Sequence, residues 1–596
     1  MGHALGYVVA ALCILAIAYR LYGVFFVHKI LRINDEEPTP AHFYGDGRNY
    51  VPTRKWATAG QHFAAIAAAG PLVGPVLAAQ FGFLPGFVWL LAGAVIGGAV
   101  HDTVVLFASM KLRGLSLSEV AKGELGPVAG WCTGLAMLFI ITVTMAGLSM
   151  VVVYALERNP WGTFAVFAIV PIAVAHGLHE RHAGVSRLAT VVAVLAVIAA
   201  VLVGPAVKHT MLGEWLTLNR QTLSLILPAY AFLMSALPVW MLLTPIGYLS
   251  SYIKVGVFAA LIAGVIFVNP TIHFPAFIAQ FAAGGPVIAG PVWPFVSITI
   301  ACGAISGFHA FVGSGVTPKL IDKWSDILPV AFGGMLVECV VGIMALVAAT
   351  SLHPEDYFAI NAAPAAFAKL GMHTIDLPRY IQEIGIDLHG RTGGAVTLAV
   401  GMTNIFTSLP WFRNLAAYFF QFVVMFEAVF ILTAVDSGTR IARYLLQDLG
   451  GEFYKPLKKI DWAPGMLAAS FLTCLAWGYL LASGDISSIW ALFGVSNQLM
   501  ASVGLIIGAT VILRLSQKRR YMLTCLIPLA YLFVTVYVAG AWMAARVYLN
   551  PAAKGYNLFN GAITLTELVL GAVILLAALR KWKKLLPGKP LAPAMG

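Results

Sequence analysis

The chain has 596 residues, of which 60% are hydrophobic and only 10% are charged. Soluble globular proteins carry about 25% charged residues, so a chain this long and this apolar cannot build a water-facing surface around several soluble domains. The formal net charge is +12, but the basic residues stand in short loops between apolar runs, where they orient membrane helices. We therefore predict an all-α polytopic membrane protein in contact with the lipid bilayer, and no nucleic-acid partner.

Apolar runs long enough to cross a bilayer as helices, about 20 residues each, recur along the whole chain. They occupy residues 5–27, 58–81, 87–110, 127–155, 161–178, 188–207, 222–251, 253–270, 294–316, 328–350, 394–411, 414–437, 463–482, 489–512, 521–545 and 561–579. The first run begins near Met1 without a basic leader or clear cleavage site, so we expect it to remain in the mature protein. The six cysteines lie inside such runs at none of the spacings typical of zinc sites or disulfides.

The distribution of lysine and arginine sets the expected orientation, because cytoplasmic loops are rich in both residues. The loop 28–55 holds five of them and the segment 82–86 holds none, so we place the N-terminus outside. Counting 394–411 as a crossing would export the basic residues after position 437. We therefore treat that segment as re-entrant or peripheral, and predict about fifteen crossings with a cytoplasmic C-terminus.

Two of the runs contain helix-breaking residues in their interior. Segment 58–81 carries Gly70-Pro71-Leu72-Val73-Gly74-Pro75, and segment 222–251 carries Ser235 among three prolines. A proline inside a helix removes a backbone hydrogen bond, and in lipid the freed groups need another partner. Interrupted helices at matching places of two halves point to the binding site of a secondary transporter. Kinks that serve packing alone are the alternative interpretation.

Five crossings counted from each interrupted segment give two sets of opposite orientation, because five is odd. We therefore predict a five-plus-five inverted-repeat core. The expected divisions are an extra helix and cytoplasmic loop at 1–55, a first repeat at 56–207, a second repeat at 220–437 and additional helices at 460–584. The loop 271–293 is uncharged and apolar, so we expect it to fold into the outer vestibule as a lid.

Several long strings in the chain have an unusual composition. They include Pro38-Thr39-Pro40-Ala41, Tyr50-Val51-Pro52-Thr53, His62-Phe63-Ala64-Ala65-Ile66, Ala301-Cys302-Gly303-Ala304-Ile305-Ser306-Gly307-Phe308-His309-Ala310, Thr317-Pro318-Lys319, Asp436-Ser437-Gly438-Thr439-Arg440 and Phe493-Gly494-Val495-Ser496-Asn497-Gln498. With these strings, over roughly residues 30–515, the chain resembles the carbon starvation protein A (CstA) family. It departs from the family at Gln61-His62, where members often carry two adjacent histidines.

The resemblance implies a permease of the bacterial or archaeal inner membrane that is linked to peptide uptake in starvation. It also implies close relatives that take up pyruvate. The family is grouped with the amino acid–polyamine–organocation carriers, whose LeuT-like fold is a five-plus-five inverted repeat.

The first interruption supplies a predicted substrate site. A half-helix that starts near Gly70 presents free N–H groups and the positive end of its dipole, which suit a carboxylate. A peptide C-terminus and pyruvate both carry one. The predicted lining residues are Gly70, Pro71, Leu72, Val73 and Gly74, with Ser235 and Trp240 at the facing interruption. Glu338 is a further candidate, as the acidic partner of a peptide amino terminus.

Ionisable groups inside membrane segments mark ion paths or buried pairs. His62, His101, Asp102 and His309 fall in the cytoplasmic halves of their helices, at a shared depth. They suit a proton relay, because histidine titrates near neutrality and Asp102 can hold a neighbour's tautomer. A polar network that only fixes helix packing is the alternative. Adjacent side chains on a helix point about 100° apart, so His101 and Asp102 do not favour a metal site.

Sodium is the rival coupling ion. Carriers of the implied fold often hold it between the first broken helix and the eighth core helix, for which segment 294–316 offers Ser306 and Ser314. These hydroxyls are neither paired nor adjacent, so we rank protons slightly higher. The chain has no Walker A sequence and no GxSxG elbow, so we predict no catalytic residue, no organic cofactor and no enzyme.

The sequence therefore predicts a secondary transporter of the inner membrane that imports peptides by ion-coupled alternating access. Pyruvate is the second substrate class. A channel and a nutrient sensor are the competing classes of protein. A channel would conduct without saturation or coupling, and a sensor would bind its ligand without counterflow. The oligomeric state stays open at this point.

Overall fold

The computed structural model describes residues 2–47, 50–67, 69–184, 186–237, 243–459, 462–516 and 518–586. In these residues helices form all of the regular structure except two isolated bridges, His3 with Thr271 and Thr53 with Ile321. Twelve helices in the described ranges are long and apolar enough to cross a membrane, or thirteen if the bent pair Lys55–Ile66 and Gly70–Phe81 counts as one span. The prediction of an all-α polytopic membrane protein is confirmed.

The helices follow the predicted apolar runs closely in most of the chain. The first half contains α1 (Ala4–Ile17, continued by π-helical turns to Ile30), α2 (Pro40–Phe43), α3 (Lys55–Ile66), α4 (Gly70–Ala78), α5 (Phe83–Ala92), α6 (Ala99–Lys111), α7 (Leu117–Leu125), α8 (Pro127–Leu156), α9 (Pro160–Ala183), α10 (Arg187–Lys208), α11 (Met211–Trp215), α12 (Arg220–Ala236) and α13 (Leu243–Val268). Local chemistry fixes several of the starts. Pro127 and Pro160 occupy the first turns of α8 and α9, where a residue without an N–H loses no helical bond.

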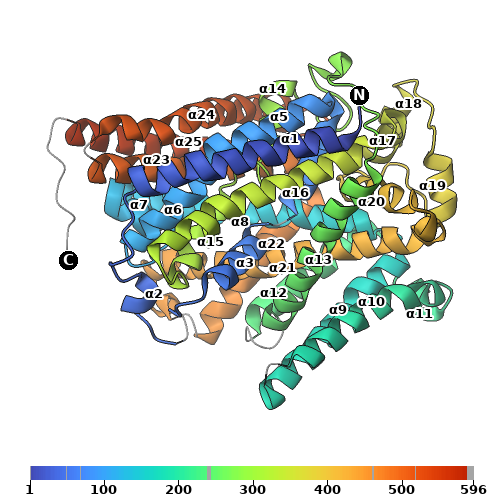
Figure 1. Cartoon of the computed structure of the whole chain (residues 1–596), viewed down its shortest axis with the longest axis horizontal. Coiled ribbons are helices and arrows are strands. Elements are labelled where there is room, and N and C mark those ends of the chain that lie inside the picture. Colours follow the sequence, from blue (N-terminus) through green and yellow to red (C-terminus); the bar gives the residue numbers. More distant parts are fainter. Residues whose placement is uncertain are drawn as a thin grey trace.

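The second half contains longer spans and several short helices. They are α14 (Val292–Thr299), α15 (Phe308–Gly315), α16 (Gly333–Thr350), α17 (Pro354–Asn361), α18 (Pro364–Ala368), α19 (Leu377–Ile384), α20 (Ala395–Thr407), α21 (Ala416–Gly451), α22 (Ala463–Ser483), α23 (Ile486–Leu515), α24 (Leu523–Met543) and α25 (Leu558–Leu585). Figure 1 shows the long helices running side by side along the longest axis, with α9 and α10 as a hairpin at one edge. The N-terminus lies at one end of this bundle, and α25 runs to the other end (Figure 1).

The predicted segment 222–251 does not form one continuous helix. α12 ends at Ala236 and α13 begins at Leu243, and residues 238–242 lie outside the described residues. The two helices contain 17 and 26 residues, and at 1.5 Å per residue their combined length, about 65 Å, is twice the thickness of the hydrocarbon core. α13 runs on through residues 251–253, where the sequence predicted the boundary between two crossings, so the expected boundary is shifted.

Two arginines of α21 bind the last turn of α12. Arg440 donates to the carbonyl of Leu237 at 2.7 Å, and Arg443 donates to the carbonyl of Ser235 at 2.9 Å. The last carbonyls of a helix have no partner within the helix, and a cation also complements the negative end of its dipole. These contacts mark the C-terminal end of α12.

The second interruption in the described part of the chain lies in the predicted segment 294–316. α14 ends at Thr299 and α15 begins at Phe308, with non-helical residues between them. No proline marks this break in the sequence, and Gly303 and Gly307 are its local signal. Glycine is also common at close helix contacts in membranes, so the sequence predicts an ordinary crossing for this segment.

Segment 394–411 forms the 13-residue helix α20. At about 20 Å it is shorter than the 30 Å hydrocarbon core. Phe406 lies against Gly264, near the end of α13, and Gly401 lies against Ala348, near the end of α16. α20 therefore lies near one end of the bundle. The predicted fifteen crossings require that the short α12 and the interrupted pair α14–α15 also cross.

The alternation of crossings makes a testable prediction about orientation. Met211 precedes α12 and is 70% exposed, whereas Phe453 follows α21 and is 87% exposed. With the N-terminus outside, we expect a membrane-impermeant maleimide to label Met211→Cys on intact cells. Phe453→Cys should react only after the cells are permeabilised. Labelling of both variants from the same side would contradict the alternation.

Candidate functional site

The two interruptions lie against each other. α3 and α4 meet at a bend of 48°, and the bend faces the non-helical residues between α14 and α15. A Cβ atom at Gly70 would overlap the Sγ atom of Cys302, and one at Gly74 would lie 2.5 Å from the carbonyl oxygen of Thr299. Glycine is required at both positions because only a residue without a side chain permits this approach. The predicted residues Gly70–Gly74 therefore lie at the contact between the interruptions.

α23 supplies the partners of the second interruption. The Asn497 side chain accepts a hydrogen bond from the N–H of Phe308 at 2.8 Å, and its backbone carbonyl accepts one from Gly307 at 3.1 Å. The Nδ2 group of Asn497 also donates to Ser306 Oγ at 3.2 Å. One residue thus satisfies two of the backbone N–H groups that the start of α15 leaves free.

The carbonyls at the end of α14 are satisfied by side chains from other helices. Gln498 Nε2 donates to the backbone carbonyl of Ser297 at 2.7 Å. Trp490 Nε1 donates to that of Thr299 at 3.2 Å, and Trp89 Nε1 to that of Ile300 at 3.3 Å. α23, expected to be one of the additional helices at 460–584, therefore packs directly against the second interruption. Its signal in the sequence was the polar string Ser496-Asn497-Gln498 inside an apolar run.

A chain of ionisable side chains lies buried beside the second interruption. His101 Nδ1 and Asp102 Oδ1 are 2.8 Å apart, and Asp102 Oδ2 and His309 Nδ1 are also 2.8 Å apart. His309 Nε2 lies 3.0 Å from Glu338 Oε2. All four side chains are at most 1% exposed. The chain joins α6, α15 and α16, and we call it the His-Asp-His-Glu chain.

This geometry extends the predicted group. The two oxygens of Asp102 meet different histidines, one on its own helix and one on α15. Glu338, for which a role as partner of a peptide amino terminus stays a prediction, is the last member of the chain. Within the described ranges, no group of three or more His, Cys, Asp or Glu residues is arranged to hold a metal ion.

His62 lies close to this chain without joining it. Its Nδ1 atom lies 2.8 Å from Thr317 Oγ1, and its ring contacts the backbone of α16 at Gly334. Its Nε2 atom is buried and has no hydrogen-bond partner among the residues that the structure describes. His62, His101 and His309, for which the sequence predicts a shared depth, therefore lie in one region of the structure.

The structure does not bring the other predicted site residues together. Ser314 donates to Ala310 in its own helix, whereas Ser306 bonds to Asn497 on α23, so the two proposed sodium ligands have separate partners. The Oγ atoms of Ser235 and of Ser470 on α22 are 2.9 Å apart. Ser235 therefore contacts α22 and does not lie at the contact between Gly70 and Cys302. Trp240 lies outside the described residues.

The far end of α4 is covered by two segments. Gln80 Oε1 accepts hydrogen bonds from the backbone N–H groups of Val287 and Ile288 at 2.7 and 2.9 Å. Tyr357 of α17 donates to the Val76 carbonyl at 2.8 Å. The uncharged loop expected to act as a lid is therefore anchored on the second half of the first interrupted helix.

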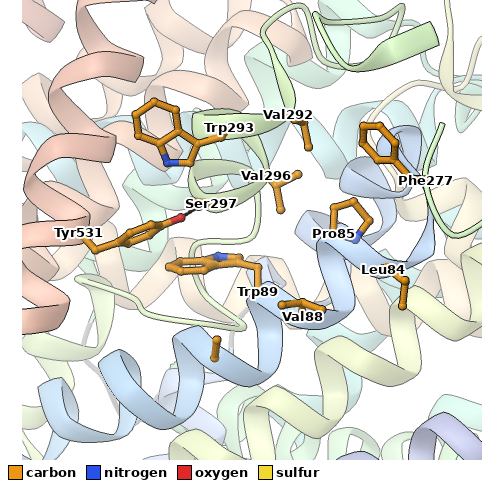
Figure 2. Close-up of a pocket in the computed structure, with 11 residues that line it drawn as sticks. Leu84, Pro85, Val88, Trp89, Phe277, Val292, Trp293, Val296, Ser297 and Tyr531 are labelled. Atoms are coloured by element: carbon orange, nitrogen blue, oxygen red, sulfur yellow. Dashed lines mark hydrogen bonds between the residues drawn. The ribbon is translucent and has the colours of Figure 1, made fainter. Parts of the chain in front are cut away.

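An apolar cleft of about 430 Å³ adjoins the second interruption from the side. Figure 2 shows Trp89 of α5 below Tyr531 of α24, with Ser297 of α14 above both rings and the loop residue Phe277 on the opposite side of the cleft. Ser297 Oγ and the Tyr531 hydroxyl are 2.7 Å apart. Val88 in the wall is 57% exposed, so the cleft opens on the surface of the bundle and not between the two interruptions.

Comparison with known proteins gives consistent matches. Residues 3–539 match a family described as Carbon starvation protein CstA. A Bacillus subtilis (strain 168) protein named Peptide transporter CstA is 67% identical over 583 residues, which cover 98% of each chain. An Escherichia coli (strain K12) protein of the same name is 40% identical, covering 93% of this chain and 82% of the relative. The Pyruvate/proton symporter BtsT of Escherichia coli (strain K12) is 38% identical, covering 93% and 83%.

The contact between the interruptions makes the next prediction. Gly70→Ala should lower the melting temperature of the purified protein by several degrees, because the added methyl group meets Cys302 and overpacking costs about 1–3 kcal/mol. Gly60→Ala is the matched control in the adjoining helix, where a Cβ atom meets nothing within 4 Å. Equal melting temperatures for the two variants would show that the interruptions do not pack as described.

Proposed function

The chain belongs to the carbon starvation protein CstA family, and on that basis we propose that it imports small peptides across the bacterial inner membrane by ion-coupled alternating access. The observation that carries the substrate class is the 67% identity, over 98% of both chains, to a relative named Peptide transporter CstA. The contact between two interrupted helices at Gly70 and Cys302 supports the mechanism.

The packing of the core supports an inverted repeat with boundaries different from 56–207 and 220–437. We assign α3–α4, α5–α6, α8, α12 and α13 to one set, and α14–α15, α16, α21, α22 and α23 to the other. Helices in matching positions then pack on each other, α8 on α21 and α12 on α22. The contact of α16 with α4 likewise corresponds to that of α6 with α15. In this assignment α9 and α10 are an insertion within the first set.

The orientation of α4 supports a carboxylate site at the first interruption. α4 begins at Gly70, so the positive end of its dipole points to the contact between the interruptions. A carboxylate of the substrate is complementary to this end of the helix. Peptides and pyruvate both meet this requirement. Pyruvate is therefore the second candidate substrate, favoured by the 38% identity to a relative named Pyruvate/proton symporter BtsT.

The His-Asp-His-Glu chain supports protons as the coupling ion. Asp102 lies on α6 of the first set, whereas His309 and Glu338 lie on α15 and α16 of the second set. A movement of the two sets against each other changes these distances and with them the affinity of His309 for a proton. A buried network that only fixes the packing is the alternative role, and it predicts loss of stability rather than loss of coupling.

Uptake by the purified protein in proteoliposomes tests the proposed function. We expect saturable uptake of labelled small peptides, driven by an imposed pH gradient and accompanied by counterflow. Competition decides between the two substrate classes. Uptake of labelled pyruvate is measured in the presence of unlabelled peptides, and uptake of labelled peptides in the presence of unlabelled pyruvate. Flux without saturation would indicate a channel, and binding without counterflow would indicate a sensor.

Asp102→Asn and Glu338→Gln test the proton path. Each variant should reduce pH-driven uptake by about tenfold or more, since a hydrogen bond to a charged group is worth about 1.5–3 kcal/mol. Counterflow at equal pH should persist, because it needs no net proton movement. Glu567→Gln is the matched control, a fully buried carboxylate on α25 that bonds to Ser496. An equal loss of uptake and counterflow in the two test variants would favour the packing role.

A further inference from the structure

Glu427 is a buried carboxylate on α21 that has no partner in the described part of the chain. The residue is 1% exposed, and neither of its oxygens accepts a hydrogen bond from a described residue. None of the ion pairs among the described residues includes it. A carboxylate in such surroundings is costly in a membrane protein and marks a functional site by default. The ligand that suits it is one that brings a positive charge.

The other buried acidic side chains in the described ranges have partners. Asp102 and Glu338 belong to the His-Asp-His-Glu chain. The remaining ones are Glu124 with Arg514, Asp326 with the N–H of Lys323, Asp356 with the N–H of Ile375, Asp436 with Tyr230 and Glu567 with Ser496. Glu338, the candidate partner of a peptide amino terminus from the sequence, thus lies against His309, whereas Glu427 has no such neighbour in the part of the chain that the structure describes.

Glu427 lies on the side of α21 that faces α8. A Cβ atom at Gly438 would overlap the Sδ atom of Met145 on α8, and one at Gly134 of α8 would lie 3.3 Å from Leu449 Cδ2. The two contacts show that α8 and α21 run in opposite directions. Gly438 follows Glu427 by eleven residues, which is three helical turns to within about 20°. Glu427 therefore faces the last turns of α8.

Contacts of α21 place this position level with the end of α3. Phe430 lies one turn along α21 from Glu427, and the centroid of its ring is 4.0 Å from the Nζ atom of Lys254. The same Nζ atom donates to the carbonyl of Ala64 at 3.1 Å. Ala64 belongs to the last turn of α3, so Glu427 lies close in depth to the first interruption.

The start of α20 connects the last turns of α8 with the start of α4. A Cβ atom at Gly393 would lie 3.8 Å from Tyr154 Cδ2, near the end of α8. One at the next residue, Gly394, would lie 3.4 Å from Val73 Cγ1, in the first turn of α4. The part of α8 that Glu427 faces thus lies near the N-terminal end of α4, and contacts around Glu427 lead to both halves of the first interrupted helix.

We propose that Glu427 binds the amino terminus of the transported peptide, while the N-terminal end of α4 binds its carboxylate. The inference deepens the proposed function and rests on it. An ammonium group donates charge-assisted hydrogen bonds to a carboxylate, and these are about twice as strong as neutral ones. A bound peptide therefore supplies the positive partner that Glu427 lacks. Pyruvate has a carboxylate but no ammonium group, so it gains nothing from Glu427.

Two substrates that differ only at the amino terminus test the assignment in proteoliposomes. Unlabelled alanylalanine should compete with labelled alanylalanine about tenfold better than N-acetyl-alanylalanine does, because acetylation removes the positive charge. Glu427→Gln should raise the KM for alanylalanine by about tenfold or more, the effect of one lost hydrogen bond between charged groups. The same variant should abolish the preference for the free amino terminus, which separates the charge from the bulk of the acetyl group.

Two further variants complete the test. Glu427→Asp keeps the charge but withdraws it by one methylene group, so it should raise the KM for alanylalanine by a smaller factor and leave that for pyruvate unchanged. Glu567→Gln is the matched control, because Glu567 is a fully buried carboxylate that bonds to Ser496 on α23. It should keep the preference of the unmodified protein.

The outcomes separate this inference from the proposed function. Absence of saturable uptake and of counterflow in the unmodified protein would overturn the proposed function itself. If that protein imports pyruvate but no peptide, or accepts the acetylated peptide equally well, the assignment of Glu427 is wrong. The same holds if Glu427→Gln impairs uptake of pyruvate as strongly as uptake of alanylalanine. Where Glu427→Gln fails to fold, the KM values of Glu427→Asp decide, and an equal change for both substrates contradicts the assignment.

Discussion

The interior of a bilayer offers no water, so every backbone group that an interrupted helix frees must find its partner within the protein. This constraint accounts for the arrangement of the core. Asn497 on α23 bonds to the residues that open α15, and Lys254 on α13 bonds to the last turn of α3. Helices far apart in the sequence are thereby fixed around two short non-helical segments.

The same interactions give the two interruptions different properties. Neutral side chains satisfy the second interruption, and their hydrogen bonds do not depend on pH. At the end of α3 the ammonium group of Lys254 binds one of the last carbonyls, that of Ala64, and a hydrogen bond from a charged donor is stronger than a neutral one. The His-Asp-His-Glu chain lies close by and joins helices of both proposed repeats. In the proposed mechanism, proton binding and helix movement therefore meet in one region.

The candidate site was predictable only in part. Glycines and prolines placed the first interruption near Gly70, and a shared depth brought His101, Asp102 and His309 into one cluster. Glu338 joined that cluster only through the packing of α16, because nothing in its own segment shows which face meets His309. The prolines around Ser235 predict the second interruption there, because a helix end carries the same residue types as a break within the membrane.

The sequence by itself determined the class of protein, the positions of nearly all apolar helices and the first interruption. These follow from composition, hydropathy and backbone-breaking residues, which are local properties. Tertiary structure alone decided which helix is interrupted a second time and which helices form the core. The reason is that a freed backbone group is tolerated only where a partner reaches it, and here the partner comes from 189 residues away, as for Asn497 and the N–H of Phe308. Local sequence cannot distinguish a helix end at the membrane surface, where water satisfies such groups, from a break that a distant side chain completes.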